Sequence, residues 1–140
     1  MSGPSPTSEI DGGDSRDARR LILVVDDEPS VRAMVLASIR VHATRYRVIE
    51  AGNATEAVAQ AKEQQPDLVL LDVALPDHDG FWVCRSLKTG SDTSQIPVVM
   101  LTAMSLPSDR EQALAAGADG YIVKPFSPRA LLEELERRLP

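Results

Sequence analysis

The sequence predicts an α/β fold, a doubly wound sheet of five parallel strands flanked by five helices. The first observation is that short apolar runs alternate with segments of helical periodicity from about residue 20 to residue 139. The second is that residues typical of helix starts and ends separate these segments. Because strands that are joined through helices lie parallel, the alternation gives one sheet that helices cover on both faces. A chain of 140 residues suits one such domain.

The first strand and helix have clear signals. Leu21–Val25 is a continuous apolar run, which is typical of a strand that is buried on both faces. Pro29 suits the first turn of the helix that follows. The apolar residues of this helix repeat at helical spacing: Val31, Met34, Val35 and Ile39.

The middle of the chain continues the alternation. Tyr46–Glu50 is predicted as the second strand, and Asn53 can cap a helix that stops before Pro66. That helix contains the apolar residues Ala57, Val58 and Ala61. Asp67–Leu71 is predicted as the third strand, and Asp79-Gly80 opens the third helix. The apolar residues of the third helix are Phe81, Trp82, Cys84 and Leu87.

The last two strand–helix pairs complete the pattern. Ile96–Leu101 is predicted as the fourth strand, followed by a helix that Ser108 or Asp109 caps and that ends at Gly117. Gly120–Val123 is predicted as the fifth strand. The final helix has Ser127 as its cap and Pro128 at its first position, with an inward-facing row of leucines: Leu131, Leu132, Leu135 and Leu139.

Composition excludes several classes of protein. The longest apolar runs fall far short of the ~20 residues that span a bilayer, so no membrane partner is predicted. The net charge of −6 argues against direct nucleic-acid binding by this domain. The single cysteine, Cys84, excludes an internal disulfide and fits the cytoplasm. Residues 1–18 are rich in Gly, Pro, Ser and Asp and are predicted to be a disordered tail, which leaves 19–140 as the folded domain.

Four of the predicted strands are followed directly by polar residues. Asp26 and Asp27 follow the first strand, Asp72 follows the third, Thr102 follows the fourth and Lys124 follows the fifth. Carboxyl ends of parallel strands meet at one edge of the sheet, where ligands of such folds bind. Three crowded carboxylates repel one another, and a bound cation removes that conflict.

This set of residues suits phosphoryl chemistry. Mg²⁺ prefers carboxylate oxygens, and a carboxylate such as Asp72 can accept a phosphoryl group to form an acyl phosphate. Thr102 could donate a hydrogen bond to a phosphoryl oxygen, and Lys124 could pair with Asp72 or with the added group. Each residue also has a structural interpretation: the aspartates could cap helices or strand ends, Thr102 could be an ordinary strand residue and Lys124 a solvated charge.

Five motifs together resemble the receiver domain of bacterial two-component response regulators. They are VVDDEP (24–29), LLD (70–72), LPDHDG (75–80), LTA (101–103) and YIVKPF (121–126), and the resemblance covers about residues 20 to 139. It implies a flavodoxin-like sheet with strand order 2-1-3-4-5. Phosphorylation of such domains biases a two-state equilibrium that changes the face made by the fourth helix, fifth strand and fifth helix.

The resemblance also implies a role for each site residue. Asp72 matches the phospho-accepting aspartate. Asp26 and Asp27 match the acidic pair that binds Mg²⁺, joined by the backbone carbonyl of Ala74. Lys124 matches the lysine of the motif. Thr102 and Tyr121 match the switch hydroxyl and the switch aromatic residue; Tyr121 could equally be a strand aromatic whose hydroxyl reaches water.

The implied partners are signalling proteins. The donor is a phosphohistidine on a sensor histidine kinase or a histidine phosphotransfer protein, and the receiver acts on a downstream effector or output domain. It turns over no external metabolite, so we do not class it as an enzyme. Phosphorylation-dependent homodimers are common in the family, but no residue in the sequence specifies one.

Two positions near the site depart from the family pattern. Ala74 and Met104 occupy positions that tune the lifetime of the acyl phosphate, where polar side chains often assist water. Both are nonpolar here, so we expect a comparatively long-lived phosphorylated state. His78 precedes Asp-Gly where the family often has an apolar residue, and it is assigned no catalytic role. Pro125 permits a cis peptide bond after Lys124.

Three other functions compete with a receiver. A Mg²⁺-dependent phosphohydrolase of the haloacid dehalogenase type also uses a strand-end Asp, but it typically needs a second Asp where this chain has Ala74. A nucleotide-binding domain is disfavoured because the chain has no G-x-G-x-x-G or G-x-x-x-x-G-K-[ST] motif. A degenerate receiver that only scaffolds is disfavoured by the complete set of five polar site residues.

Overall fold

Five parallel strands form one sheet in the order β2-β1-β3-β4-β5. The computed structural model describes residues 18–41, 45–103 and 107–139. The strands are β1 (Arg20–Val25), β2 (Tyr46–Ala51), β3 (Leu68–Asp72), β4 (Val98–Thr102) and β5 (Gly120–Val123). The helices are α1 (Pro29–Arg40), α2 (Ala54–Gln64), α3 (Gly80–Thr89), α4 (Pro107–Ala115) and α5 (Pro128–Arg138). The predicted fold class and strand order are therefore confirmed.

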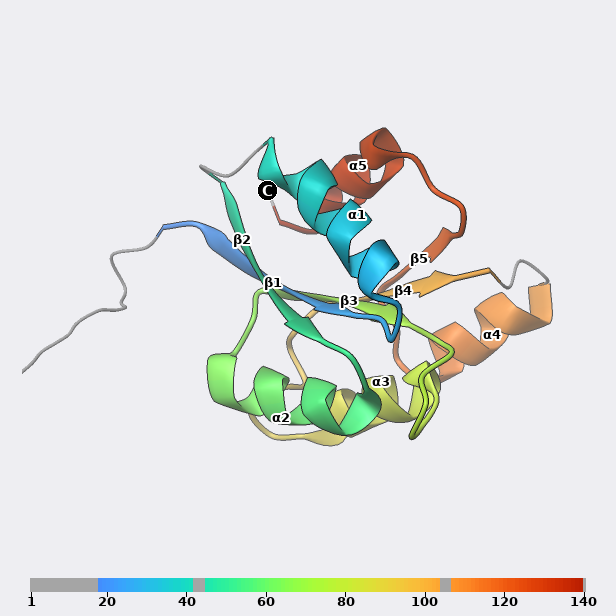
Figure 1. Ribbon diagram of the computed structural model, residues 1–140. Coiled ribbons are helices and arrows are strands. Elements are labelled where there is room, and N and C mark those ends of the chain that lie inside the picture. The colour runs from blue at the N-terminus through green and yellow to red at the C-terminus, as the bar shows by residue number, and fades with distance from the viewer. Residues whose placement is uncertain (1–17, 42–44, 104–106, 140) are drawn as a thin grey trace, which may run out of the picture.

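The helices cover both faces of the sheet. Figure 1 shows α1 and α5 on one face and α2 and α3 on the other, with α4 beside the β5 edge. Alternate residues of the inner strands supply each face, as a two-sided sheet requires. Ile22 and Val24 of β1 pack toward α1 and α5, whereas Leu23 and Val25 pack toward α2 and α3. Two hydrophobic cores therefore hold the central strands, one on each face.

The strand register aligns the residues that the sequence places at strand ends. Val25 of β1 pairs with Leu71 of β3, so the next residues, Asp26 and Asp72, lie side by side. Thr102 of β4 pairs with Val123 of β5, the residue before Lys124. The order of the strands reverses between β1 and β3, and that reversal is where ligands bind in doubly wound sheets.

The predicted caps Asn53 and Ser127 are confirmed, and Asp79, predicted to open the third helix, also caps it. The side chains of Asn53, Asp79 and Ser127 accept hydrogen bonds from the backbone N–H groups at the starts of α2, α3 and α5, at 2.8, 2.8 and 3.0 Å. The predicted cap of the fourth helix is wrong. The helix begins at Pro107, so Ser108 and Asp109 lie in its first turn. Proline's fixed φ favours this first helical position.

Other boundaries and burials shift slightly. The third and fourth strands run one residue further than predicted, through Asp72 and Thr102. Met34 in the predicted apolar row of the first helix is 41% exposed. Gly117 has φ of 96°, the left-handed conformation that favours glycine, just beyond the end of α4. Residues 1–17 of the predicted tail, and Met104, lie outside the described residues.

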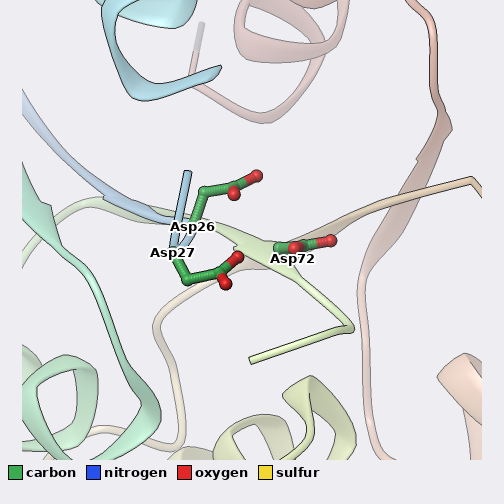
Figure 2. Close-up of side chains that lie close together, drawn as sticks. All are labelled: Asp26, Asp27 and Asp72. Atoms are coloured by element: carbon green, nitrogen blue, oxygen red, sulfur yellow. The ribbon is translucent and has the colours of Figure 1, made fainter. Parts of the chain in front are cut away.

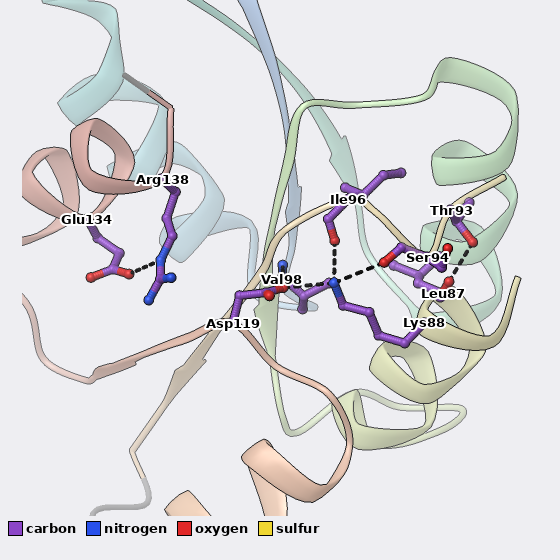
Figure 3. Close-up of polar contacts among 9 residues, drawn as sticks. All are labelled: Leu87, Lys88, Thr93, Ser94, Ile96, Val98, Asp119, Glu134 and Arg138. Carbon is purple, nitrogen blue, oxygen red and sulfur yellow. Dashed lines mark hydrogen bonds and ion pairs between the residues drawn. The ribbon is translucent and has the colours of Figure 1, made fainter. Parts of the chain in front are cut away.

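A polar network joins α3 to the amino ends of β4 and β5. Lys88 Nζ lies 2.8 Å from Asp119 Oδ2 and 2.7 Å from the carbonyl oxygen of Ile96 (Figure 3). Asp119 in turn accepts a hydrogen bond from the N–H of Val98 at 2.8 Å. These contacts fix the sheet at the end opposite Asp26, Asp72 and Thr102.

Among the described residues, no helix combines the length and apolar character that crossing a membrane requires.

Candidate functional site

Three carboxylates meet beyond the carboxyl ends of β1 and β3. Oxygen atoms of Asp26, Asp27 and Asp72 all lie within 4.8 Å of one another. Figure 2 shows the three side chains extending to the same side of the strand ends. Asp26 is fully buried and Asp72 nearly so, whereas Asp27 is exposed. The cluster is therefore open to solvent on the Asp27 side and closed on the other.

Lys124 is the counter-ion of the two buried carboxylates. Its Nζ lies 2.9 Å from Asp26 Oδ2 and 3.3 Å from Asp72 Oδ1. Burial alone would lower the pKa of the Lys124 ammonium, but the hydrogen bond to Asp26 and the charge of Asp72 outweigh it and raise that pKa. The Lys124-Pro125 peptide bond is cis. Lys124 is thus a charged member of the cluster rather than a solvated surface residue.

The pKa of the Asp72 carboxyl is raised above its ordinary value. Burial raises its pKa, and the charge of Asp26 raises it further. Lys124 and a hydrogen bond from the backbone N–H of Ala74 act in the opposite direction without cancelling the rise. A carboxylate under this repulsion gains from a bound divalent cation, so the crowded acids fit Mg²⁺.

Thr102 and Tyr121 are coupled on the neighbouring strands. Thr102 is 2% exposed at the end of β4, and its side chain hydrogen-bonds to that of Tyr121 on β5. The guanidinium carbon of Arg110 in α4 lies 5.9 Å from the centre of the Tyr121 ring. Burial and the charge of Asp109 raise the pKa of the tyrosine. A hydroxyl beside the acidic cluster is therefore linked through Tyr121 to α4.

The structure shows two further contacts near the site that are not evident from the sequence. A Cβ atom at Gly80 would lie 2.3 Å from the backbone oxygen of Asp72, so α3 approaches the end of β3 as closely as only glycine permits. The Asp77 carboxylate accepts hydrogen bonds from the N–H groups of Ala54 and Thr55 at 2.8 and 2.9 Å, which ties the loop after β3 to α2. The LPDHDG motif contains both residues, but their contacts depend on tertiary structure.

Ala74 and His78 lie in the loop between β3 and α3. Ala74 is exposed, and its backbone N–H donates to Asp72. The ring of His78 stacks on Trp82 with centroids 3.9 Å apart and an interplanar angle of 11°. This contact packs His78 against the first turn of α3.

Comparison with known proteins decides the family. Residues 22–136 match the family model of the response regulator receiver domain. The chain belongs to this family. It is a receiver domain of two-component signalling.

Curated relatives of the receiver are longer regulators. It is 46% identical over 118 residues to a probable transcriptional regulator, ycf27, of Porphyridium aerugineum, covering 84% of this chain and 45% of the relative. It is 41% identical over 117 residues to the phosphate regulon transcriptional regulatory protein PhoB of Pseudomonas aeruginosa, covering 84% and 50%. The chain thus spans about half the length of these relatives.

Solved receiver structures share the fold. The chemotaxis protein CheY4 of Vibrio cholerae superposes with a TM-score of 0.81 at 34% identity, over 87% of this chain and all of that one. The receiver domain of a sensor histidine kinase from Pseudomonas aeruginosa gives a TM-score of 0.78 at 34% identity, over 86% and 97% of the two chains. That structure holds a magnesium ion coordinated in its active-site cleft.

Proposed function

We propose that residues 19–140 form a phospho-accepting receiver in which Asp72 takes a phosphoryl group from a phosphohistidine. The observation that carries the proposal is the cluster of Asp26, Asp27 and Asp72, in which the Lys124 ammonium contacts Asp26 and Asp72. An oxygen of Asp72 attacks phosphorus, the P–N bond of the donor breaks, and the imidazole leaves with the electron pair of that bond. The product is an acyl phosphate on Asp72.

The metal ligands follow from the same arrangement. We assign Asp26, Asp27, Asp72 and the backbone carbonyl of Ala74 to Mg²⁺, whose chemical contribution is to neutralise charge on the transferring oxygens. The crowding of the three carboxylates and the magnesium ion in the related kinase receiver support this assignment. Lys124 adds a fixed positive charge that can pair with the new phosphoryl group.

The output is a change of the surface made by α4, β5 and α5. Movement of the Thr102 hydroxyl toward the phosphoryl group would break its hydrogen bond with Tyr121. A cavity of about 340 Å³ on this surface is lined by Tyr121 and by residues of α4 and α5, including Arg110, Leu114 and Arg138. A turn of the Tyr121 ring would therefore change the shape of this cavity, which supports a role in partner binding.

The partners and location complete the proposal. The donor is a sensor histidine kinase or histidine phosphotransfer protein of the cytoplasm, and the acceptor of the signal is an effector protein or output domain. Relatives of twice the length carry names such as the DNA-binding response regulator MtrA of Mycolicibacterium smegmatis. We do not assign nucleic-acid binding to this domain, because the chain's net charge of −6 would repel the phosphate backbone. The receiver accelerates its own phosphorylation and consumes no metabolite. A homodimer that forms on phosphorylation is one form that its output can take.

Intact mass spectrometry tests the proposal. The protein is incubated with Mg²⁺ and either acetyl phosphate or phosphoramidate, whose P–N bond resembles that of phosphohistidine. We expect one added phosphoryl group on the wild type, none on Asp72→Asn, and loss of the adduct when Mg²⁺ is chelated. Asp92→Asn, which changes an exposed aspartate outside the cluster, is the matched control and should be phosphorylated like the wild type. A wild type that gains no phosphoryl group from either donor would contradict the proposal.

A further inference from the structure

Every polar atom of Asp26 has a partner. Its N–H donates to the carbonyl of Ala51 at 3.2 Å, and its Oδ1 accepts the N–H of Glu28 at 3.0 Å. Its Oδ2 pairs with Lys124 at 2.9 Å, and its carbonyl oxygen accepts a short hydrogen bond from Nη1 of Arg32. Three of these partners lie at strand ends or in the turn after β1: Ala51, Lys124 and Glu28. The guanidinium instead comes from α1. Arg32 therefore acts on the peptide group that joins Asp26 to the next residue.

Arg32 is itself held in place by β2. Its Nε lies 2.9 Å from Oε1 of Glu50, and its side chain is 19% exposed. The guanidinium also covers Gly52, where a Cβ atom would lie 3.5 Å from Nη1. The planar guanidinium offers several N–H groups in fixed directions, so it can serve Glu50 and the Asp26 carbonyl together. A lysine, with one nitrogen, would not reproduce both contacts in this geometry.

We propose that Arg32 is a positioning residue of the divalent-cation site, with Glu50 fixing its orientation. The inference rests on the proposed function, because it assumes that Asp26 and Asp27 bind the cation. By holding the peptide between them, Arg32 sets the direction in which both carboxylates leave the backbone. Groups that orient metal ligands without touching the metal typically contribute 10–100-fold to its affinity.

The sign of the effect separates positioning from simple charge. A guanidinium near three carboxylates repels a cation, so if Arg32 acted through its charge alone, neutralising it would tighten Mg²⁺ binding. If Arg32 positions the Asp26–Asp27 peptide, neutralising it weakens Mg²⁺ binding. For Glu50 both effects weaken Mg²⁺ binding, so their size separates them: the Glu50 side chain is 42% exposed, and loss of its charge alone should weaken binding only slightly.

Calorimetric titration with Mg²⁺ alone tests the inference. We expect Arg32→Gln to weaken Mg²⁺ binding about 10-fold or more and Arg32→Lys to weaken it less. Arg40→Gln, which changes an exposed arginine in the last turn of the same helix, is the control and should stay within about two-fold of the wild type. Glu50→Gln should lie between the control and Arg32→Gln, and it remains informative if Arg32→Gln folds poorly.

A metal-free measurement accompanies the titration. The amide of Glu28 donates to Asp26 Oδ1, so its hydrogen exchange should be faster in Arg32→Gln than in the wild type without Mg²⁺. Unchanged or tighter Mg²⁺ binding by a folded Arg32→Gln variant would overturn the inference while leaving the proposed function intact. A wild type that binds no Mg²⁺ would instead contradict the proposed function.

Discussion

Removing the Lys124 ammonium should lower the free energy of unfolding of the metal-free protein, and added Mg²⁺ should restore part of that loss. Lys124→Met keeps most of the apolar stem but leaves the fully buried Asp26 and the nearly buried Asp72 without their shared cation. Breaking a fully buried ion pair costs ~3–5 kcal/mol. Because the Lys124 side chain is 20% exposed and solvent screens it partly, we expect a loss of about 2 kcal/mol in the free energy of unfolding. For a chain of this size that lowers the unfolding temperature by about 6 °C.

Urea unfolding with and without Mg²⁺ measures this effect. A divalent cation supplies the missing positive charge, so Mg²⁺ should raise the free energy of unfolding of Lys124→Met more than that of the wild type. Lys62→Met, which changes an exposed lysine of α2, should differ from the wild type by less than about 0.5 kcal/mol under both conditions. A Lys124→Met deficit that is the same with Mg²⁺ and with chelator would refute the reasoning, because the ammonium and the metal would then act on different carboxylates.

Three further predictions concern the same strand ends. Asp72→Asn should raise the free energy of unfolding of the metal-free protein at pH 7, since burial and the charge of Asp26 raise the pKa of this carboxyl in the folded state. Folded wild-type Asp72 becomes neutral as pH falls through its raised pKa, so the gain should shrink between that pKa and the ordinary value of 3.8; a pH series of urea titrations checks it. Gly80→Ala should lower the free energy of unfolding by about 2 kcal/mol, measured by thermal unfolding, because the new Cβ meets the Asp72 backbone. The same variant should be phosphorylated more slowly. Ala74→Asn should speed decay of the acyl phosphate by giving water a hydrogen-bond partner; an unchanged decay rate, followed by intact mass, would contradict this.

The fold could be predicted from the sequence because its signals are local and consistent. Apolar runs such as Leu21–Val25 are buried on both faces, and the caps at Asn53, Asp79 and Ser127 form as their residue types suggest. The predicted start of α4 is wrong because Pro107 takes the first helical position, ahead of the two residues of capping type that follow it. The approach of Asp26 to Asp72 followed from strand ends in a parallel sheet, which is a property of the topology rather than of either residue.

Contacts between distant elements could not be predicted in the same way. Arg32 has an ordinary helical position, and only the packed structure brings it to Glu50, 18 residues away, and to the Asp26 carbonyl. Glu134 reads as a solvated residue of an amphipathic helix, yet it is 6% exposed and paired with Arg138 at 2.9 Å (Figure 3). A Cβ at Gly120 would lie 2.6 Å from Glu134, so the missing side chain on β5 makes room for this acid.

The single lysine among three aspartates has a consequence for the choice of ion. With the carboxylates ionised and Lys124 protonated, the cluster carries two net negative charges, which one divalent ion neutralises completely. A monovalent ion would leave one excess negative charge, which repels an incoming phosphoryl group. A trivalent ion would leave one excess positive charge, which would hold the phosphoryl group at the site. The cluster is thus matched in valence as well as in ligand type, so the concentration of free Mg²⁺ should set the fraction of molecules that are ready to accept a signal.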